Sequence, residues 1–162
     1  MEINTFALLL ELQEVSRSVL KYCRELEEIY SFQEPGKVAS ESELETFANS
    51  GYKETVKHLL LASNKFGDLY IRQAEMESTH SPSMKYNIRM LRNMWEHREE
   101  KLIGPAGQWD DNKANTKWLN EKYGRNWLLC WSISKGPDGI TIGELVPVAA
   151  LRDEASHWLA NF

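Results

Sequence analysis

The chain has 162 residues, of which 42% are hydrophobic and 27% are charged. A chain of this length and composition can bury a hydrophobic core without disulfides or metals, so we expect one domain over residues 1–162. The net charge of −5 argues against a protein that coats nucleic acid unspecifically, because such binding depends mainly on Lys and Arg side chains that neutralise phosphates.

The first predicted element is one long amphipathic helix over residues 3–31. Its apolar side chains recur at alternating spacings of four and three residues: Leu8, Leu12, Val15, Val19, Tyr22, Leu26 and Ile29. The start of the chain has no basic segment, and Glu11 interrupts its apolar run, so we expect neither a signal peptide nor a membrane span.

Cys23 and Cys130 lie in apolar surroundings, which favours reduced core thiols of a cytoplasmic protein over a single disulfide bridge between them.

Two further helices are predicted in the middle of the chain. Ser40 and Glu43 are typical of a capping box, so the second helix is expected over residues 40–77. It should pack antiparallel to the first, since the connection is short. Its apolar stripe consists of Ala48, Tyr52, Leu59, Ala62, Phe66 and Leu69. The segment 81–83, Ser-Pro-Ser, begins a third helix that we expect over residues 84–103.

The periodicity changes in the last third of the chain. After a short helix expected near residues 114–122, residues 127–146 predict a β-hairpin with Leu129, Trp131 and Ile133 on one face, and a last helix closes the chain. We therefore expect a mainly α fold, an up-and-down helical bundle with residues 104–162 as a C-terminal elaboration. Its core should contain Leu12, Val15, Tyr22, Leu59, Phe66, Leu91 and Trp95.

The most informative segment is IRMLRNMWEHREE, residues 88–100. It combines Arg92, the adjacent Asn93 and, five positions after the arginine, His97 in a strongly helical setting. Arginine offers a charged planar fork that grips phosphate oxygens, and histidine gains or loses a proton near neutral pH. These side chains suit the holding of a phosphodiester and the movement of its protons, so the segment predicts metal-independent RNA cleavage.

On a helix, the side chains of Arg92 and His97 point in different directions. Arg89, Asn93 and His97 follow one another at intervals of four and form one polar stripe, with Arg92 and Glu96 beside it. Five residues turn a helix by about 140°, which separates Arg92 from His97. One helix thus gives an incomplete site. A symmetric homodimer, with two arginines and two histidines near its two-fold axis, would complete it.

The run LRNMWEH resembles the signature of the HEPN superfamily, in which an arginine is followed by a polar residue and, a few positions on, by a histidine. The resemblance covers the motif and the helical pattern before it, about half of the chain. It implies an HEPN-type helical bundle that dimerises through the motif helices and, in catalytic members, a composite ribonuclease cleft. Arg92 matches the motif arginine, Asn93 its polar neighbour and His97 the motif histidine.

One position departs from a branch of that family. In the branch paired with nucleotidyltransferase antitoxins, a tyrosine that becomes modified stands two places after the histidine, and Glu99 occupies that place here. A partner nucleotidyltransferase is therefore not expected. Many members of the family are non-catalytic binding modules, so membership alone would not establish an enzyme.

The charge distribution supports an RNA-handling helix. Residues 1–50 carry ten acidic and four basic side chains, whereas residues 84–103 carry five basic and three acidic ones, a net charge of +2. A concentrated positive segment thus coincides with the motif, as expected of a helix that handles RNA, although a net charge of +2 is modest and the glutamates would repel phosphate unless they point away. The substrate-binding residues expected around the motif are Lys85, Arg89, Glu96 and Lys101.

The predicted function is that of an endoribonuclease acting as a toxin or antiviral effector. His97 would serve as general acid or base for attack by the 2′-hydroxyl, Arg92 would stabilise the phosphorane, and Asn93 would orient the substrate or the histidine. No cofactor is expected. The expected partners are RNA, a second copy of the chain and a cognate antitoxin or other protein.

Other interpretations stay open. Arg92 could pair with Glu96 on a solvated helix face, with His97 a plain surface histidine. The net acidity favours a second alternative, a non-catalytic helical dimer that binds a nucleotide, RNA or a protein. A third is a structural adaptor that uses the long first helices as an interaction surface.

A metal centre is not expected from the sequence. Glu77 and His80 give one ExxH pair, and Glu54 with His58 gives a pair four residues apart, but a di-iron bundle needs two ExxH helices and two more carboxylates. His58 is of more interest as a neighbour of the expected cleft, with a plain surface histidine as the other reading.

Overall fold

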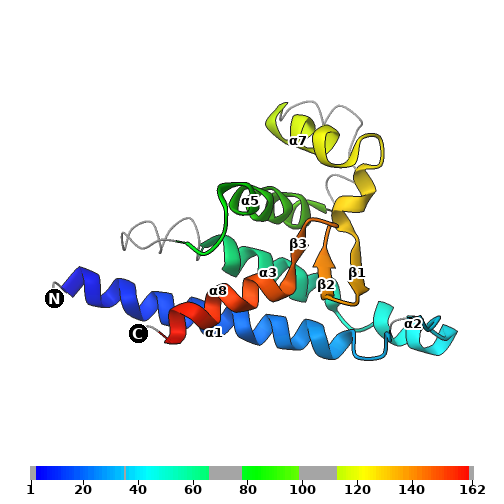
Figure 1. Ribbon diagram of the computed structural model, residues 1–162, viewed down its shortest axis with the longest axis horizontal. Coiled ribbons are helices and arrows are strands. Elements are labelled where there is room, and N and C mark those ends of the chain that lie inside the picture. The colour runs from blue at the N-terminus through cyan, green and yellow to red at the C-terminus, as the bar shows by residue number, and fades with distance from the viewer. Residues whose placement is uncertain (1–2, 35, 66–77, 99–112, 161–162) are drawn as a thin grey trace.

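A computed structural model describes residues 3–34, 36–65, 78–98 and 113–160 of the chain. Its elements follow one another as α1 (Ile3–Ile29), α2 (Glu41–Ala48), α3 (Tyr52–Lys65), α5 (Pro82–Glu96), α7 (Lys113–Tyr123), the 3₁₀-helix η3 (Trp127–Trp131), β1 (Ile133–Gly136), β2 (Gly139–Ile142), β3 (Val146–Pro147) and α8 (Val148–Ala160) (Figure 1). The predictions of a mainly helical fold, and of a hairpin followed by a closing helix, are confirmed.

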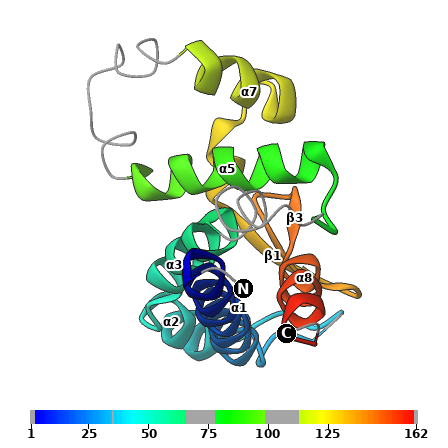
Figure 2. The same cartoon turned by 90° about the vertical axis from the view of Figure 1, so that its left-hand side faces the viewer.

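The axes of α1, α3 and α8 lie roughly along one direction, and α5 crosses them (Figure 1). Helix α1 packs against both α3 and α8, and α3 packs in turn against α5. Helices α3 and α8 both run antiparallel to α1, which confirms the predicted packing of the first two long helices (Figure 1). In Figure 2, α1 and α8 are seen nearly end-on while α5 is seen along its length, so α5 crosses them at a steep angle. Among the described residues, no helix is both long and apolar enough to cross a bilayer.

The second predicted helix is divided into two, which corrects the expectation of one helix over residues 40–77. The capping box at its start is confirmed, because Ser40 and Glu43 exchange side-chain and backbone hydrogen bonds of 3.0 and 3.2 Å. Helix α2 ends at Ala48. Gly51 adopts a φ of +75°, a left-handed backbone conformation that residues other than glycine rarely adopt. Helix α3 then begins at Tyr52. Residues 66–77 lie outside the described part of the chain.

Helix α5 begins as the sequence predicts but ends earlier. The Ser81 side chain accepts a 3.1 Å hydrogen bond from the Met84 backbone N–H, and Pro82 occupies the first turn. The helix ends at Glu96, and His97 is its C-cap with a φ of −104°. The expectation of one unbroken helix through residue 103 is therefore wrong at His97; Arg98 is helical again, and residues 99–103 lie outside the described part.

The first predicted strand of the hairpin is wrong for residues 127–131, which form η3. A strand would put consecutive side chains on opposite faces, yet Cys130 and Trp131 are both buried while Leu128 is 64% exposed. The 3₁₀ turn also lets the Trp131 indole donate a 2.9 Å hydrogen bond to the Met94 carbonyl. The hairpin proper is β1 with β2, paired antiparallel from Ile133↔Ile142 to Gly136↔Gly139, and β3 joins the other side of β2.

Tryptophan side chains join α5 to the C-terminal elements in one core. The Trp95 indole donates a 2.9 Å hydrogen bond to the Cys130 carbonyl, and the Trp118 indole donates a 3.2 Å bond to Asn87 Oδ1. Of the predicted core residues, Leu12, Leu59, Leu91 and Trp95 are buried. Val15 and Tyr22 are only half-buried, because they line a hollow between α1 and α3, and Phe66 lies outside the described residues.

Candidate functional site

Arg92 lies on α5 and is held by its two helical neighbours. Its Nη1 donates a 2.5 Å hydrogen bond to Oδ1 of Asn93 and lies 3.5 Å from Oε2 of Glu96. The Arg92 side chain is 30% exposed. Its buried Nε–H has no hydrogen-bond acceptor among the residues that the structure describes. The guanidinium is thus oriented, partly desolvated and still able to donate.

The exposed edge of Arg92 opens into a hollow of about 180 Å³ between α3 and α5, which we call the arginine pocket. Helix α3 supplies four of its lining residues and α5 supplies two, and together they are Glu54, Lys57, His58, Leu61, Arg92 and Glu96. These α3 residues recur at intervals of three and four, so one side of the helix presents them all. The pocket therefore combines two permanent cations, two carboxylates and one imidazole.

The formal charges in the arginine pocket balance when His58 is neutral. Lys57 Nζ lies 3.2 Å from Oε1 of Glu54, and Arg92 pairs with Glu96. To bind Lys57 and Arg92, a phosphate would therefore have to displace the carboxylates of Glu54 and Glu96. The carboxylate of each pair is exposed, so each pair contributes only modest stability and its exchange for a phosphate costs little.

The structure brings some of the predicted site residues together and leaves others apart. Arg92 contacts both Asn93 and Glu96, but Asn93 does not line the pocket. His97 is exposed at the end of α5 and is not among the residues that line the pocket.

The remaining predicted substrate contacts lie outside the arginine pocket. Arg89 is exposed and Lys85 is half-buried on α5, and neither lines the pocket. Lys101 lies outside the described part of the chain. The basic side chain that joins Arg92 in the pocket is instead Lys57 of α3.

His58 is the histidine that the fold places beside Arg92. It lines the arginine pocket from α3, and its ring lies 5.3 Å from the ring of Tyr22 on α1, centroid to centroid. The sequence indicated that His58 could lie near the cleft but could not predict that it lies beside Arg92. The way in which α3 packs against α5 brings the two side chains to the same pocket.

No protein-family model, no curated protein and no solved structure matches this chain. Within the described ranges, no group of three or more His, Cys, Asp and Glu side chains is arranged to hold a metal ion.

Proposed function

We propose that the protein is a metal-independent endoribonuclease whose active site is centred on Arg92. The observation that carries the proposal is the arginine pocket, in which Arg92 and Lys57 stand beside an imidazole and two carboxylates. Phosphate binding needs the cations, and proton transfer needs the imidazole or a carboxylate. A small pocket that holds both kinds of group supports cleavage of a phosphodiester better than binding alone.

In the proposed reaction the ribose 2′-hydroxyl loses its proton to a base as its oxygen attacks the adjacent phosphorus. The bond from phosphorus to the 5′ oxygen breaks, and that oxygen takes a proton from an acid. The products are a 2′,3′-cyclic phosphate and a free 5′-hydroxyl. Arg92 stabilises the negative charge that grows on the non-bridging oxygens, a role to which its planar fork is suited.

Two histidines are available for the two proton transfers. His97 is the general acid or base that the motif indicates, and His58 of the arginine pocket takes the other role. His97 is exposed at the end of α5, so it can reach a pocket on a second copy of the chain. The proposal therefore includes a homodimer in which α5 helices meet near the two-fold axis.

An endoribonuclease of this kind would act as a toxin or an antiviral effector, restrained by an antitoxin or another partner protein. Induced expression in cells is a direct test. Wild-type chain should arrest growth, and Arg92→Ala should not.

The biochemical test is cleavage of a mixed RNA pool with EDTA present. Wild type should cleave, and Arg92→Ala, His97→Ala and His58→Ala should each lose about a hundredfold or more in rate, because each removes a group that acts in the transition state. Arg125→Ala and His157→Ala are matched controls, since both side chains are exposed and lie outside the pocket. Strands with 2′-deoxyribose should resist cleavage. Equal cleavage by wild type and Arg92→Ala would reject the proposal.

A second candidate function is a non-catalytic helical module that binds a nucleotide, RNA or a protein. The observation that favours it is the charge balance of the arginine pocket, where both cations already have carboxylate partners. This module would bind an oligonucleotide without cleaving it and would be harmless on expression. That pair of results separates it from the ribonuclease.

A further inference from the structure

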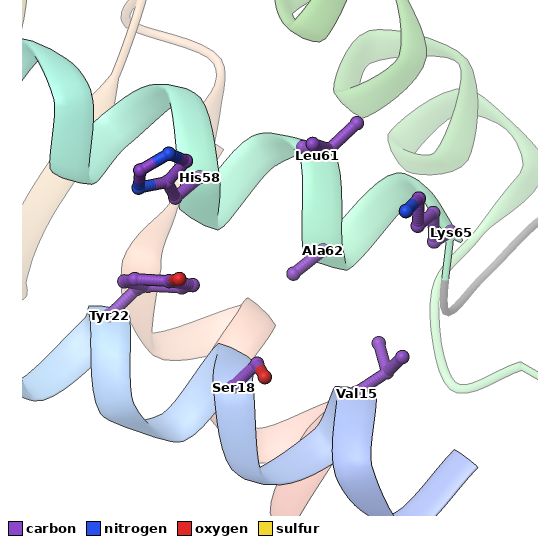
Figure 3. A pocket seen from close by; sticks show the side chains of 7 residues that line it. All are labelled: Val15, Ser18, Tyr22, His58, Leu61, Ala62 and Lys65. Carbon is purple, nitrogen blue, oxygen red and sulfur yellow. The ribbon is translucent and has the colours of Figure 1, made fainter. Parts of the chain in front are cut away.

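A second hollow adjoins the arginine pocket along α3 and shares two of its lining residues. It occupies about 170 Å³ between α1 and α3, and we call it the tyrosine groove. Figure 3 shows its lining, with Tyr22 facing His58 at one end and Val15 facing Lys65 at the other. The residues that line it are Val15, Ser18, Tyr22, His58, Leu61, Ala62 and Lys65.

The composition of the tyrosine groove differs from that of the arginine pocket. Its lining includes the apolar side chains of Val15, Leu61 and Ala62, and its end is aromatic, with the Tyr22 and His58 rings tilted by 38°. No carboxylate lines it, and the cation Lys65 does. A second ammonium, Lys21 Nζ, lies 5.6 Å from the centre of the Tyr22 ring. This set of groups suits a flat aromatic ring attached to an anion.

His58 and Leu61 line both hollows, so the two hollows adjoin along α3. A ligand that places an aromatic ring against Tyr22 can place an attached phosphate on the side of Arg92. This adjacency of an aromatic surface and a cationic pocket is how single-stranded nucleic acid is held, since each base offers a ring face and each linkage offers a charge.

We propose that the tyrosine groove is a nucleobase subsite, and that the substrate is therefore single-stranded RNA with an unpaired base stacked against Tyr22. This inference rests on the proposed ribonuclease function, which it deepens by naming the substrate class. In a duplex the bases are stacked on one another, so they are unable to enter the groove. Ser18 keeps acceptor lone pairs for the base edge, because its hydroxyl donates to the Glu14 carbonyl at 3.1 Å.

The test measures binding by fluorescence anisotropy, with the full chain and a short labelled oligoribonucleotide whose 2′-hydroxyls are methylated so that it is not cleaved. Three forms of the probe are compared at one salt concentration: single strand, duplex and a strand whose backbone carries no bases. Wild type should bind the single strand about tenfold more tightly than the base-free strand, since stacking contributes about that much per base.

Variants of the groove should remove this preference. Tyr22→Ala and Ala62→Phe, the second of which fills the hollow without deleting the aromatic ring, should bind the single strand and the base-free strand alike. Tyr22→Phe keeps the ring and should bind as wild type does. Phe6→Ala is a matched control, because Phe6 is an exposed aromatic side chain on the same helix and lines neither hollow.

The outcomes separate this inference from the proposed function. Arg92-dependent cleavage together with equal binding of the base-free strand by wild type and Tyr22→Ala would overturn the subsite alone. A base preference that depends on Tyr22, without any cleavage, would support the subsite and reject the ribonuclease. Wild-type chain that neither binds the single strand nor cleaves RNA would overturn both.

Discussion

Asn93 Oδ1 accepts a 2.5 Å hydrogen bond from Arg92 Nη1, so these neighbours on α5 form one unit in which the amide aims the guanidinium. Replacing Asn93 by Ala should therefore weaken catalysis by only about tenfold, because it removes one hydrogen bond that orients the guanidinium and leaves the positive charge in place. Arg92→Lys should lose far more, because an ammonium lacks the two-pronged grip. Initial cleavage rates with EDTA present measure both. A loss in Asn93→Ala equal to that in Arg92→Ala would contradict this division of roles.

The pairing of Arg92 with Glu96 predicts how binding responds to removal of the carboxylate. Glu96→Gln should bind a methylated single-stranded oligonucleotide about threefold more tightly, because phosphate no longer competes with an ion pair of modest strength. Anisotropy titrations at low and moderate salt measure the change. Glu121→Gln on α7 is the control, since Glu121 is exposed and lies outside both hollows. Weaker binding by Glu96→Gln would show that the carboxylate helps the substrate directly.

The bond from the Trp95 indole to the Cys130 carbonyl predicts a loss of stability on substitution. Trp95→Phe leaves that buried carbonyl without its donor and leaves a gap beside it, so the free energy of unfolding should fall by about 2–4 kcal/mol. Urea unfolding measures the change. Trp127→Phe is the control, because the bond from its indole to Asn120 is exposed, and it should change stability by less than about 1 kcal/mol. Equal effects in the two variants would contradict the assignment.

Both cysteines should be unreactive in the folded chain. Burial is the main cause that raises the pKa of Cys23 to about 12, with the Glu27 carboxylate adding to it, and burial likewise raises the pKa of Cys130 to about 12. Few thiolates then exist at about pH 8, and the thiolate is the reactive form. A colorimetric thiol reagent should label the native protein slowly and both cysteines at once after unfolding in urea. Rapid labelling of one cysteine in the native protein would show that its site opens.

Acid should destabilise the fold through His80. Burial lowers the pKa of His80 below its ordinary 6.5, and the nearby Glu154 carboxylate opposes this effect without reversing it. The unfolded chain therefore takes up a proton that the folded chain resists, so the free energy of unfolding falls as pH drops below about 6.5. Urea midpoints at about pH 7.5 and 5.5 should differ more for wild type than for His80→Gln. A steeper decline in the variant would reverse the sign of this contribution.

The sequence by itself determined those elements whose causes are local. Alternating spacings predicted α1 to within two residues of its end, and the side chains of Ser40 and Glu43 predicted a capping box that the structure contains. Ser81 and Pro82 likewise predicted the start of α5. Periodicity and caps act within a few residues of one another, so a single chain carries enough information for them.

Only the tertiary structure decided the remaining elements, because distant contacts determine them. The apolar stripe ran through Gly51 without interruption, yet a left-handed backbone divides α2 from α3 there. Residues 127–131 form a continuous apolar run that is compatible with a strand, but the buried Met94 carbonyl and the packing of Cys130 favour a 3₁₀ turn. Tertiary packing overrides local preference where several buried groups need partners at once.

The candidate site divides in the same way. The sequence identified Arg92, Asn93 and Glu96 because they are neighbours on one helix, and the structure joins them by direct contacts. It had no means of placing His58 and Lys57 beside Arg92, since that depends on how α3 packs across α5. The relative position of two helices is determined by which side chains interlock between them. The spacing of apolar residues within either helix does not predict this long-range packing.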